Sequence, residues 1–128
     1  GYLKAEDVSR CLQAADLVAL PFSDGASERR TTLMAALCHG VAVVSTVGHN
    51  TGTTLRGADF LSLVPATDAN AFIERVTSLL RDDAGRSEMA KRGLVRHDAA
   101  YSWPVVTEQF SAALDAAGLL SVVPLPRR

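Results

Sequence analysis

Excess charge of either sign and long hydrophobic runs are both missing from this sequence. Its 128 residues carry 13 basic and 14 acidic side chains, a formal net charge of −1. A nearly neutral chain offers no broad field to nucleic acid or to an anionic membrane, so no nucleic-acid partner is expected. The longest apolar stretches, around 17–22 and 41–44, are far too short to cross a bilayer, and no secretory signal is recognisable. We therefore expect a cytoplasmic protein that binds anions through a few locally placed residues.

Cysteine and aromatic residues are also scarce. Cys11 and Cys38 have neither CxxC spacing nor a set of histidine partners, which argues against a disulfide or a metal site. Each lies in an apolar helical pattern, so we expect two small core residues in a reducing compartment. Aromatic residues make up only 5% of the chain, but hydrophobic residues make up 48%, enough for a packed core. The length fits one domain.

Helical and strand-like patterns alternate along the chain. Apolar residues at three- and four-residue spacing predict helices over 5–15, 28–39, 67–81, 84–100 and 104–117. Continuous apolar runs predict strands, buried on both faces, over 17–22 and 41–46, with a shorter strand over 60–65 and a further short one offered by 1–3. This order indicates a Rossmann-like three-layer α/β/α fold with a parallel sheet.

The predicted sheet is small for its class. Three clear strands are fewer than the roughly five or six that such sheets usually have. We therefore expect part of a larger α/β domain over residues 1–121, followed by a flexible tail over 122–128.

A few isolated side chains carry weak chemical signals. His39 precedes the helix-ending Gly40, where an imidazole can interact with the last carbonyls. His97 is expected to be solvated on a polar helix face, and Trp103 to pin the last helix to the domain. No Ser–His–Asp order, HExxH motif or P-loop lysine is present, so we assign no catalytic residue and no metal site.

Two loops are expected at the carboxyl ends of the strands, where open parallel sheets bind ligands. The first, over 23–30, combines a glycine, the free amides of a helix start and two adjacent arginines, which together suit a phosphate group. Arginine in a first helical turn is unfavourable by roughly 0.3–1 kcal/mol unless an anion answers it. Asp24 and Glu28 can neutralise the arginine charges as solvent-exposed carboxylates. A bound phosphate can also neutralise them, and the two alternatives can coexist.

The candidate binding residues come from both loops. The first loop contributes Gly25, Ala26, Ser27, Glu28, Arg29, Arg30, Thr31 and Thr32. The second loop, over 47–56, contributes Gly48 and His49.

The order of these parts resembles the carboxyl-terminal half of family-4-type glycosyltransferases, which have the GT-B architecture. The resemblance is carried by the segments 8–22 and 33–46, the Val47-Gly48-His49-Asn50 loop and the Tyr101-Ser102-Trp103 stretch before a last helix. It covers nearly the whole chain. It implies a half-domain that binds a nucleotide-diphosphate sugar and takes part in hexosyl transfer, with retained configuration, to an acceptor hydroxyl. It implies no cofactor and no metal.

The chain departs from the family pattern at two positions. The family usually has two glutamates eight positions apart, and alignment on Gly40 places Ser27 and Ala35 there. Ala35 cannot make the hydrogen bond to the donor ribose that the second glutamate commonly makes, and Glu28 is one residue away from the first position. The turn over 24–32 resembles a variant found in some bacterial members. By this resemblance, the donor phosphate contacts fall to Ser27, Arg29, Arg30 and Thr31.

The resemblance also implies parts that this sequence does not hold. The amino-terminal acceptor domain is missing, so the 128 residues alone are expected to be inactive. The alternative is a non-catalytic, transferase-like module used for protein contacts, which the loss of both glutamates favours. It predicts that an exposed sheet edge is covered by a partner or by a second copy in a homodimer. A receiver-like domain would need an acidic cluster after its first strand, which is not found.

Overall fold

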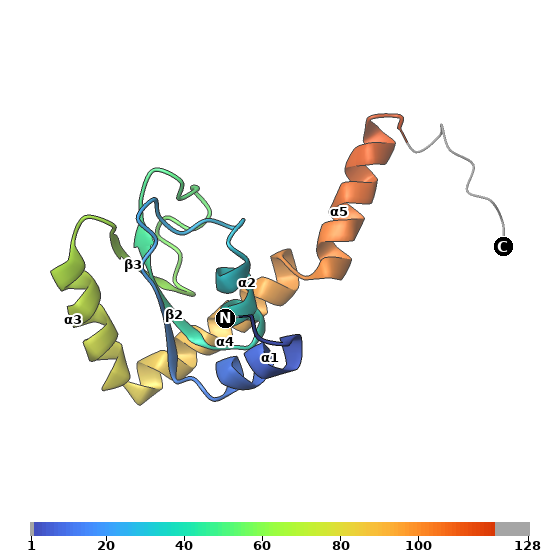
Figure 1. The fold of residues 1–128 in the computed structure, drawn as a ribbon. Helices are drawn as coiled ribbons and strands as arrows, with labels where there is room; N and C mark the ends of the chain where they lie inside the picture. The colour runs from blue at the N-terminus through green and yellow to red at the C-terminus, as the bar shows by residue number, and fades with distance from the viewer. Residues whose placement is uncertain (1, 120–128) are drawn as a thin grey trace.

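The computed structural model describes residues 2–119, which fold around a parallel sheet (Figure 1). The described strands are β1 (Leu17–Leu20), β2 (Ala42–Val47) and β3 (Ser62–Pro65), in the order β1-β2-β3. Leu17 pairs with Ala42, and Val44 pairs with Ser62. The predicted α/β fold is confirmed, and the carboxyl ends of the strands share one edge of the sheet.

Helices flank this sheet. Those of the described residues are α1 (Ala5–Gln13), α2 (Thr31–Cys38), α3 (Ala69–Leu80), α4 (Asp83–Ala100) and α5 (Trp103–Ala116). The carboxylate of Asp68 accepts the Ala71 N–H at the start of α3, and the carboxylate of Asp82 caps α4 in the same way. Gly40, with φ of +62°, ends α2 as predicted. Within residues 2–119, no helix is both long enough and apolar enough to cross a membrane.

Two apolar clusters lie on opposite faces of β2. Val43 packs with α2 and the 55–61 segment, whereas Ala42 and Val44 pack with α3 and the first half of α4. The alternation of side chains along the strand produces this division. Gly93 lets α4 approach closely, because a Cβ there would lie 3.0 Å from the Leu37 side chain. The central strand is therefore buried on both faces, as predicted.

The first strand differs from the prediction. Its side chains are half-buried or exposed, because β1 lies at an edge of the described sheet and pairs there with β2. It also ends at Leu20, one residue before Pro21, which has no N–H to donate. Tyr2 and Leu3 form no strand, whereas Gly1 and the predicted tail over 122–128 lie outside the described residues.

The last helix corrects another expectation. Trp103 is 81% exposed and Phe110 is 64% exposed. Helix α5 contacts α4 near their junction and then extends away from the sheet (Figure 1). Trp103 therefore does not pin α5 to the domain. An apolar stripe in a sequence indicates that one face of a helix tends to be buried, but it does not show which element packs against that face.

Smaller predictions also changed. Both Cys11 and Cys38 are exposed, so the expectation of core residues is wrong. The His97 side chain is only 13% exposed, so the expectation of a solvated histidine is wrong as well. The His39 prediction is confirmed, because its Nδ1 lies 2.7 Å from the Ala35 carbonyl oxygen.

Candidate functional site

Two loops leave the carboxyl ends of β1 and β2 and meet through glycine backbones. Gly25 has a φ of +95°, and a Cβ there would collide with the Gly48 nitrogen and the Thr51 hydroxyl. A Cβ on Gly48 would lie 2.5 Å from the carbonyl oxygen of Asp24. Glycine at both positions therefore lets the two loops touch.

Hydroxyl groups at the end of β2 hold the first loop against the sheet. Ser45 Oγ donates to the Leu20 carbonyl at 2.8 Å, and Thr46 Oγ1 donates to the Phe22 carbonyl at 2.5 Å. The Ala26 N–H donates to the Thr46 carbonyl at 2.8 Å. These bonds fix the path of the chain where β1 ends and the loop begins.

Asp24 connects the two loops electrostatically. Its carboxylate forms an ion pair with Arg30 and accepts a hydrogen bond from Asn50 Nδ2 at 2.8 Å. The Arg30 guanidinium also lies 4.5 Å from the centre of the Phe22 ring. The Asn50 hydrogen bond lowers the pKa of the Asp24 carboxyl below its ordinary value; burial opposes this shift, and the charges of Arg30 and His49 reinforce it. Arg30 thus already has an anionic partner.

Helix α2 begins later than the sequence predicts. It starts at Thr31, with Arg30 as its N-cap, and the Arg30 N–H donates to the Ser27 carbonyl at 3.0 Å. The two arginines therefore precede the helix and do not lie in its first turn. Tertiary bonds to the Ala26 amide and to the Asp24 carboxylate hold this segment as a turn. Within the described part of the chain, the amides of Thr31 and Thr32 have no hydrogen-bond partner.

The two loops enclose an open pocket of about 550 Å³. Its walls are Ser27, Glu28, Arg29, Arg30, His49, Asn50, Thr51 and Gly52. The sequence identified the first five of these, whereas Asn50, Thr51 and Gly52 were not among the predicted binding residues. A Gly- and Thr-rich loop at a strand end was the available signal for them.

The other predicted residues lie around this pocket. Ala26 is fully buried in the core with its amide already bonded, so it does not face a ligand. Gly25 and Gly48 set the contact between the loops. Thr31 and Thr32 are exposed at the start of α2.

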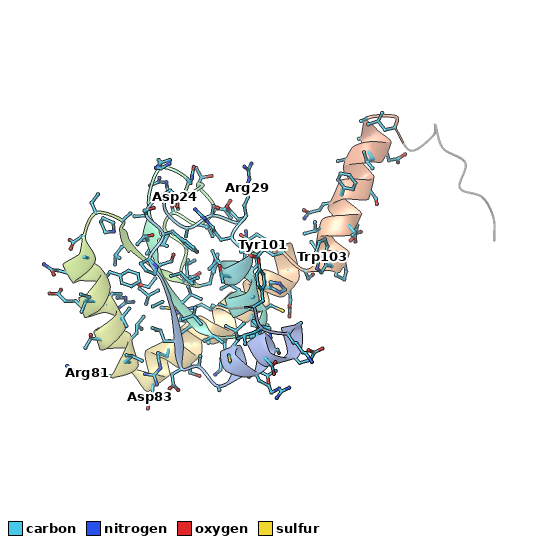
Figure 2. All side chains as sticks on the ribbon, in the orientation of Figure 1. Asp24, Arg29, Arg81, Asp83, Tyr101 and Trp103 are labelled. Atoms are coloured by element: carbon cyan, nitrogen blue, oxygen red, sulfur yellow. The ribbon has the colours of Figure 1, made fainter. Side chains whose placement is uncertain are left out.

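Some charged side chains on the pocket wall have ion-pair partners among the described residues, and others do not. Arg29 is exposed and forms no ion pair with any described residue; it extends outward from the loop in Figure 2. Glu28 is half-buried, and its carboxylate faces Gly52, 3.5 Å from where a Cβ would stand. One guanidinium and one carboxylate are thus open to a ligand here.

Arg56 fastens the second loop, a role that the sequence did not reveal. Its Nε donates to the Thr51 carbonyl at 2.9 Å and its Nη2 to the Gly48 carbonyl at 2.7 Å. A lone arginine in a loop has no motif that would have shown this. It stabilises the loop by donating to two of its backbone carbonyl oxygens.

Comparison with known proteins adds one finding. The family model described as glycosyl transferases group 1 matches residues 1–82. That range holds the whole sheet, both loops of the pocket and α1 to α3. A search of curated proteins returns no match.

Proposed function

The chain belongs to the group 1 glycosyl transferases, and we propose that its loop pocket binds the diphosphate of a nucleotide-sugar donor. The pocket lies at the carboxyl edge of a parallel sheet, the usual ligand position in such folds. Its volume of about 550 Å³ falls within the range of small-molecule sites.

One observation carries this proposal: among the described residues, Arg29 has no ion-pair partner and the first amides of α2 have no hydrogen-bond partner, while Arg30 beside them is paired with Asp24. A guanidinium fork matches two phosphate oxygens, and the open N–H groups at a helix start also donate hydrogen bonds to an anion. Arg29 and the amides of Thr31 and Thr32 would bind the diphosphate. Arg30 would hold the loop in place.

The same groups would assist the chemical step. Negative charge grows on the departing nucleoside diphosphate during glycosyl transfer. Fixed amides and a guanidinium stabilise that charge without rearranging as it develops. The proposed reaction is hexosyl transfer, with retained configuration, to an acceptor hydroxyl, with the acceptor bound by an amino-terminal domain beyond this sequence.

Glu28 would replace the family glutamate that contacts the ribose. Ala35 stands at the family position and has no hydrogen-bonding side chain. Glu28 lines the pocket and has no hydrogen bond to any described residue. Its carboxylate can accept hydrogen bonds from two adjacent ribose hydroxyls.

Calorimetry of the 128-residue chain tests the proposal. UDP, GDP and ADP are titrated separately, and we expect weak binding of at least one. Arg29→Gln should weaken that binding about tenfold, because a charge-assisted hydrogen bond is lost. Arg81→Gln removes the same charge from the exposed end of α3 (Figure 2) and should leave the affinity unchanged. A folded chain that gives no heat with any of the three nucleotides would overturn the proposal.

A non-catalytic interaction module is the second candidate. It is favoured by Ala35 at the family position and by the exposed Trp103 and Phe110 on α5. Sedimentation separates the two candidates. A concentration-dependent dimer without nucleotide binding supports the module, whereas a monomer that binds a nucleoside diphosphate supports the transferase.

A further inference from the structure

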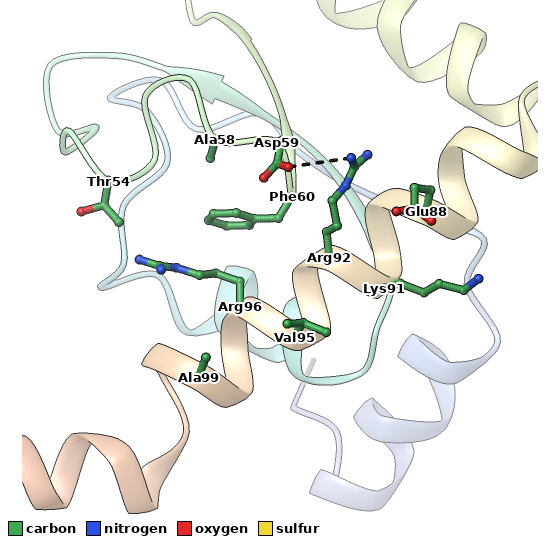
Figure 3. Close-up of a pocket in the computed structure, with 10 residues that line it drawn as sticks. All are labelled: Thr54, Ala58, Asp59, Phe60, Glu88, Lys91, Arg92, Val95, Arg96 and Ala99. Atoms are coloured by element: carbon green, nitrogen blue, oxygen red, sulfur yellow. Dashed lines mark ion pairs between the residues drawn. The ribbon is translucent and has the colours of Figure 1, made fainter.

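A second pocket lies between the 54–60 segment and residues 88–99 of α4 (Figure 3). Its volume is about 640 Å³, and it shares no lining residue with the loop pocket. Much of its wall is apolar, formed by Ala58, Phe60, Val95 and Ala99. Thr54 and Arg96 add polar groups at one end, and the other end carries the charged side chains of Asp59, Glu88, Lys91 and Arg92.

Arg96 is the unusual group in this pocket. Its guanidinium carbon lies 5.9 Å from the centre of the Phe60 ring and 5.5 Å from that of Tyr101. Its Nε is buried and has no hydrogen-bond partner in the part of the chain that the structure describes. Among residues 2–119, no carboxylate forms an ion pair with it. Among the described residues, two aromatic rings contact this half-buried cation and no carboxylate pairs with it, so an anion is the partner that its charge would favour.

Arg92, one helical turn earlier, differs in this respect. It lies 3.7 Å from the carboxylate of Asp59, as the dashed line in Figure 3 marks. The two arginines lie on opposite sides of the Phe60 ring in that view. Arg92 therefore has a carboxylate partner, whereas Arg96 has none among residues 2–119.

We propose that this pocket binds a small organic acid, with its carboxylate on Arg96 and its apolar body against Phe60 and Val95. The planar guanidinium presents paired N–H groups whose spacing matches the two oxygens of a carboxylate. The apolar wall between the arginines takes a ring or a short aliphatic chain. This inference stands apart from the donor proposal, because the two pockets have no residue in common.

Titrations of the isotope-labelled chain, followed by two-dimensional NMR, test the ligand chemistry. Benzoate is the probe, acetate supplies the carboxylate alone and benzyl alcohol supplies the ring alone. Benzoate at millimolar concentration should shift the amide signals of Thr54, Phe60 and Arg96 in a saturable way. Acetate should act more weakly and benzyl alcohol least. Absence of benzoate shifts at this pocket, or equal shifts with benzyl alcohol, would overturn the proposal.

Variants then test the role of Arg96. Arg96→Gln should weaken benzoate binding about tenfold, since a charge-assisted hydrogen bond is lost, whereas Arg81→Gln should not. Arg96→Lys keeps the charge without the fork and should give an intermediate affinity, which serves if Arg96→Gln fails to fold. Equal affinities for the wild type, Arg96→Lys and Arg81→Gln would contradict the assignment.

Discussion

Asp24 is the residue on which the geometry of the loop pocket depends most. Its carboxylate pairs with Arg30 on its own loop and accepts a hydrogen bond from Asn50 on the other. Its backbone carbonyl accepts the Asn50 N–H at 3.0 Å. By holding Arg30, it leaves Arg29 as the arginine of this loop that is open to a ligand. The Asp24 carboxylate thus holds the two loops together before a ligand binds at the neighbouring anion site.

The pH dependence of stability should report this carboxylate. Its pKa is lower in the folded chain than in the unfolded chain, chiefly through the Asn50 hydrogen bond. The carboxylate contributes its full stabilisation above its pKa in the unfolded chain, which is about 4. It is lost as pH falls through the folded-state pKa, because the unfolded chain then binds more protons. Asp24→Asn should lower stability at neutral pH and reduce the difference between neutral pH and about pH 3.

Urea denaturation at the two pH values measures that difference. Asp16→Asn makes the same change at an exposed aspartate away from the loop pocket. If Asp24→Asn loses as much stability on acidification as the wild type, the role given to this carboxylate is wrong.

The residue-level assignment of the site was only partly open to prediction. Parallel strands bring both loops to one edge, so their meeting was predictable from the order of elements. Two adjacent arginines, however, look equivalent in a sequence. Only the folded loop shows that Arg30 turns to Asp24 and Phe22 while Arg29 extends outward.

Among the helices and strands, the features set by local sequence could be predicted, whereas those set by tertiary contacts could not. The presence of α3 and the glycine after α2 follow from local sequence signals, and both were predicted correctly. The start of α2 was not, because bonds to Ala26 and Asp24 hold residues 27–30 outside the helix. The burial of β1 was also missed, since an apolar run does not reveal which strand lies at an edge.

The cap of α3 gives a prediction at this scale. The Asp68 carboxylate accepts the Ala71 N–H at 2.9 Å. Asp68→Ala leaves that amide without its partner and should lower the free energy of unfolding by about 1 kcal/mol. Asn70→Ala, an exposed change in the first turn of the same helix, should change it by less than about 0.5 kcal/mol. Equal effects of the two changes in thermal denaturation would contradict the capping role.

At the scale of the whole molecule, the core surrounds β2 and α5 lies outside it. Phe60 is 7% exposed within the core, whereas Phe110 on α5 is 64% exposed. In Figure 1, α5 extends away from the sheet that the other helices flank. Stability should therefore depend on the first phenylalanine and hardly on the second.

Matched alanine substitutions test this division. Phe60→Ala should lower the free energy of unfolding by about 3–5 kcal/mol, from lost burial and a cavity. Phe110→Ala should change it by less than about 0.5 kcal/mol. Chemical denaturation measures both. A loss at Phe110 comparable with that at Phe60 would place α5 inside the core and contradict the described arrangement.

We infer that the two loops form one anion site for a nucleoside diphosphate. The most direct measurement is a titration of the isotope-labelled chain with whichever of UDP, GDP and ADP gives heat in calorimetry, followed residue by residue by two-dimensional NMR. We predict saturable shifts of the amide signals confined to residues 27–32 and 49–52, and their loss in Arg29→Gln. Shifts that map elsewhere on the folded chain, or that persist unchanged in Arg29→Gln, would contradict it.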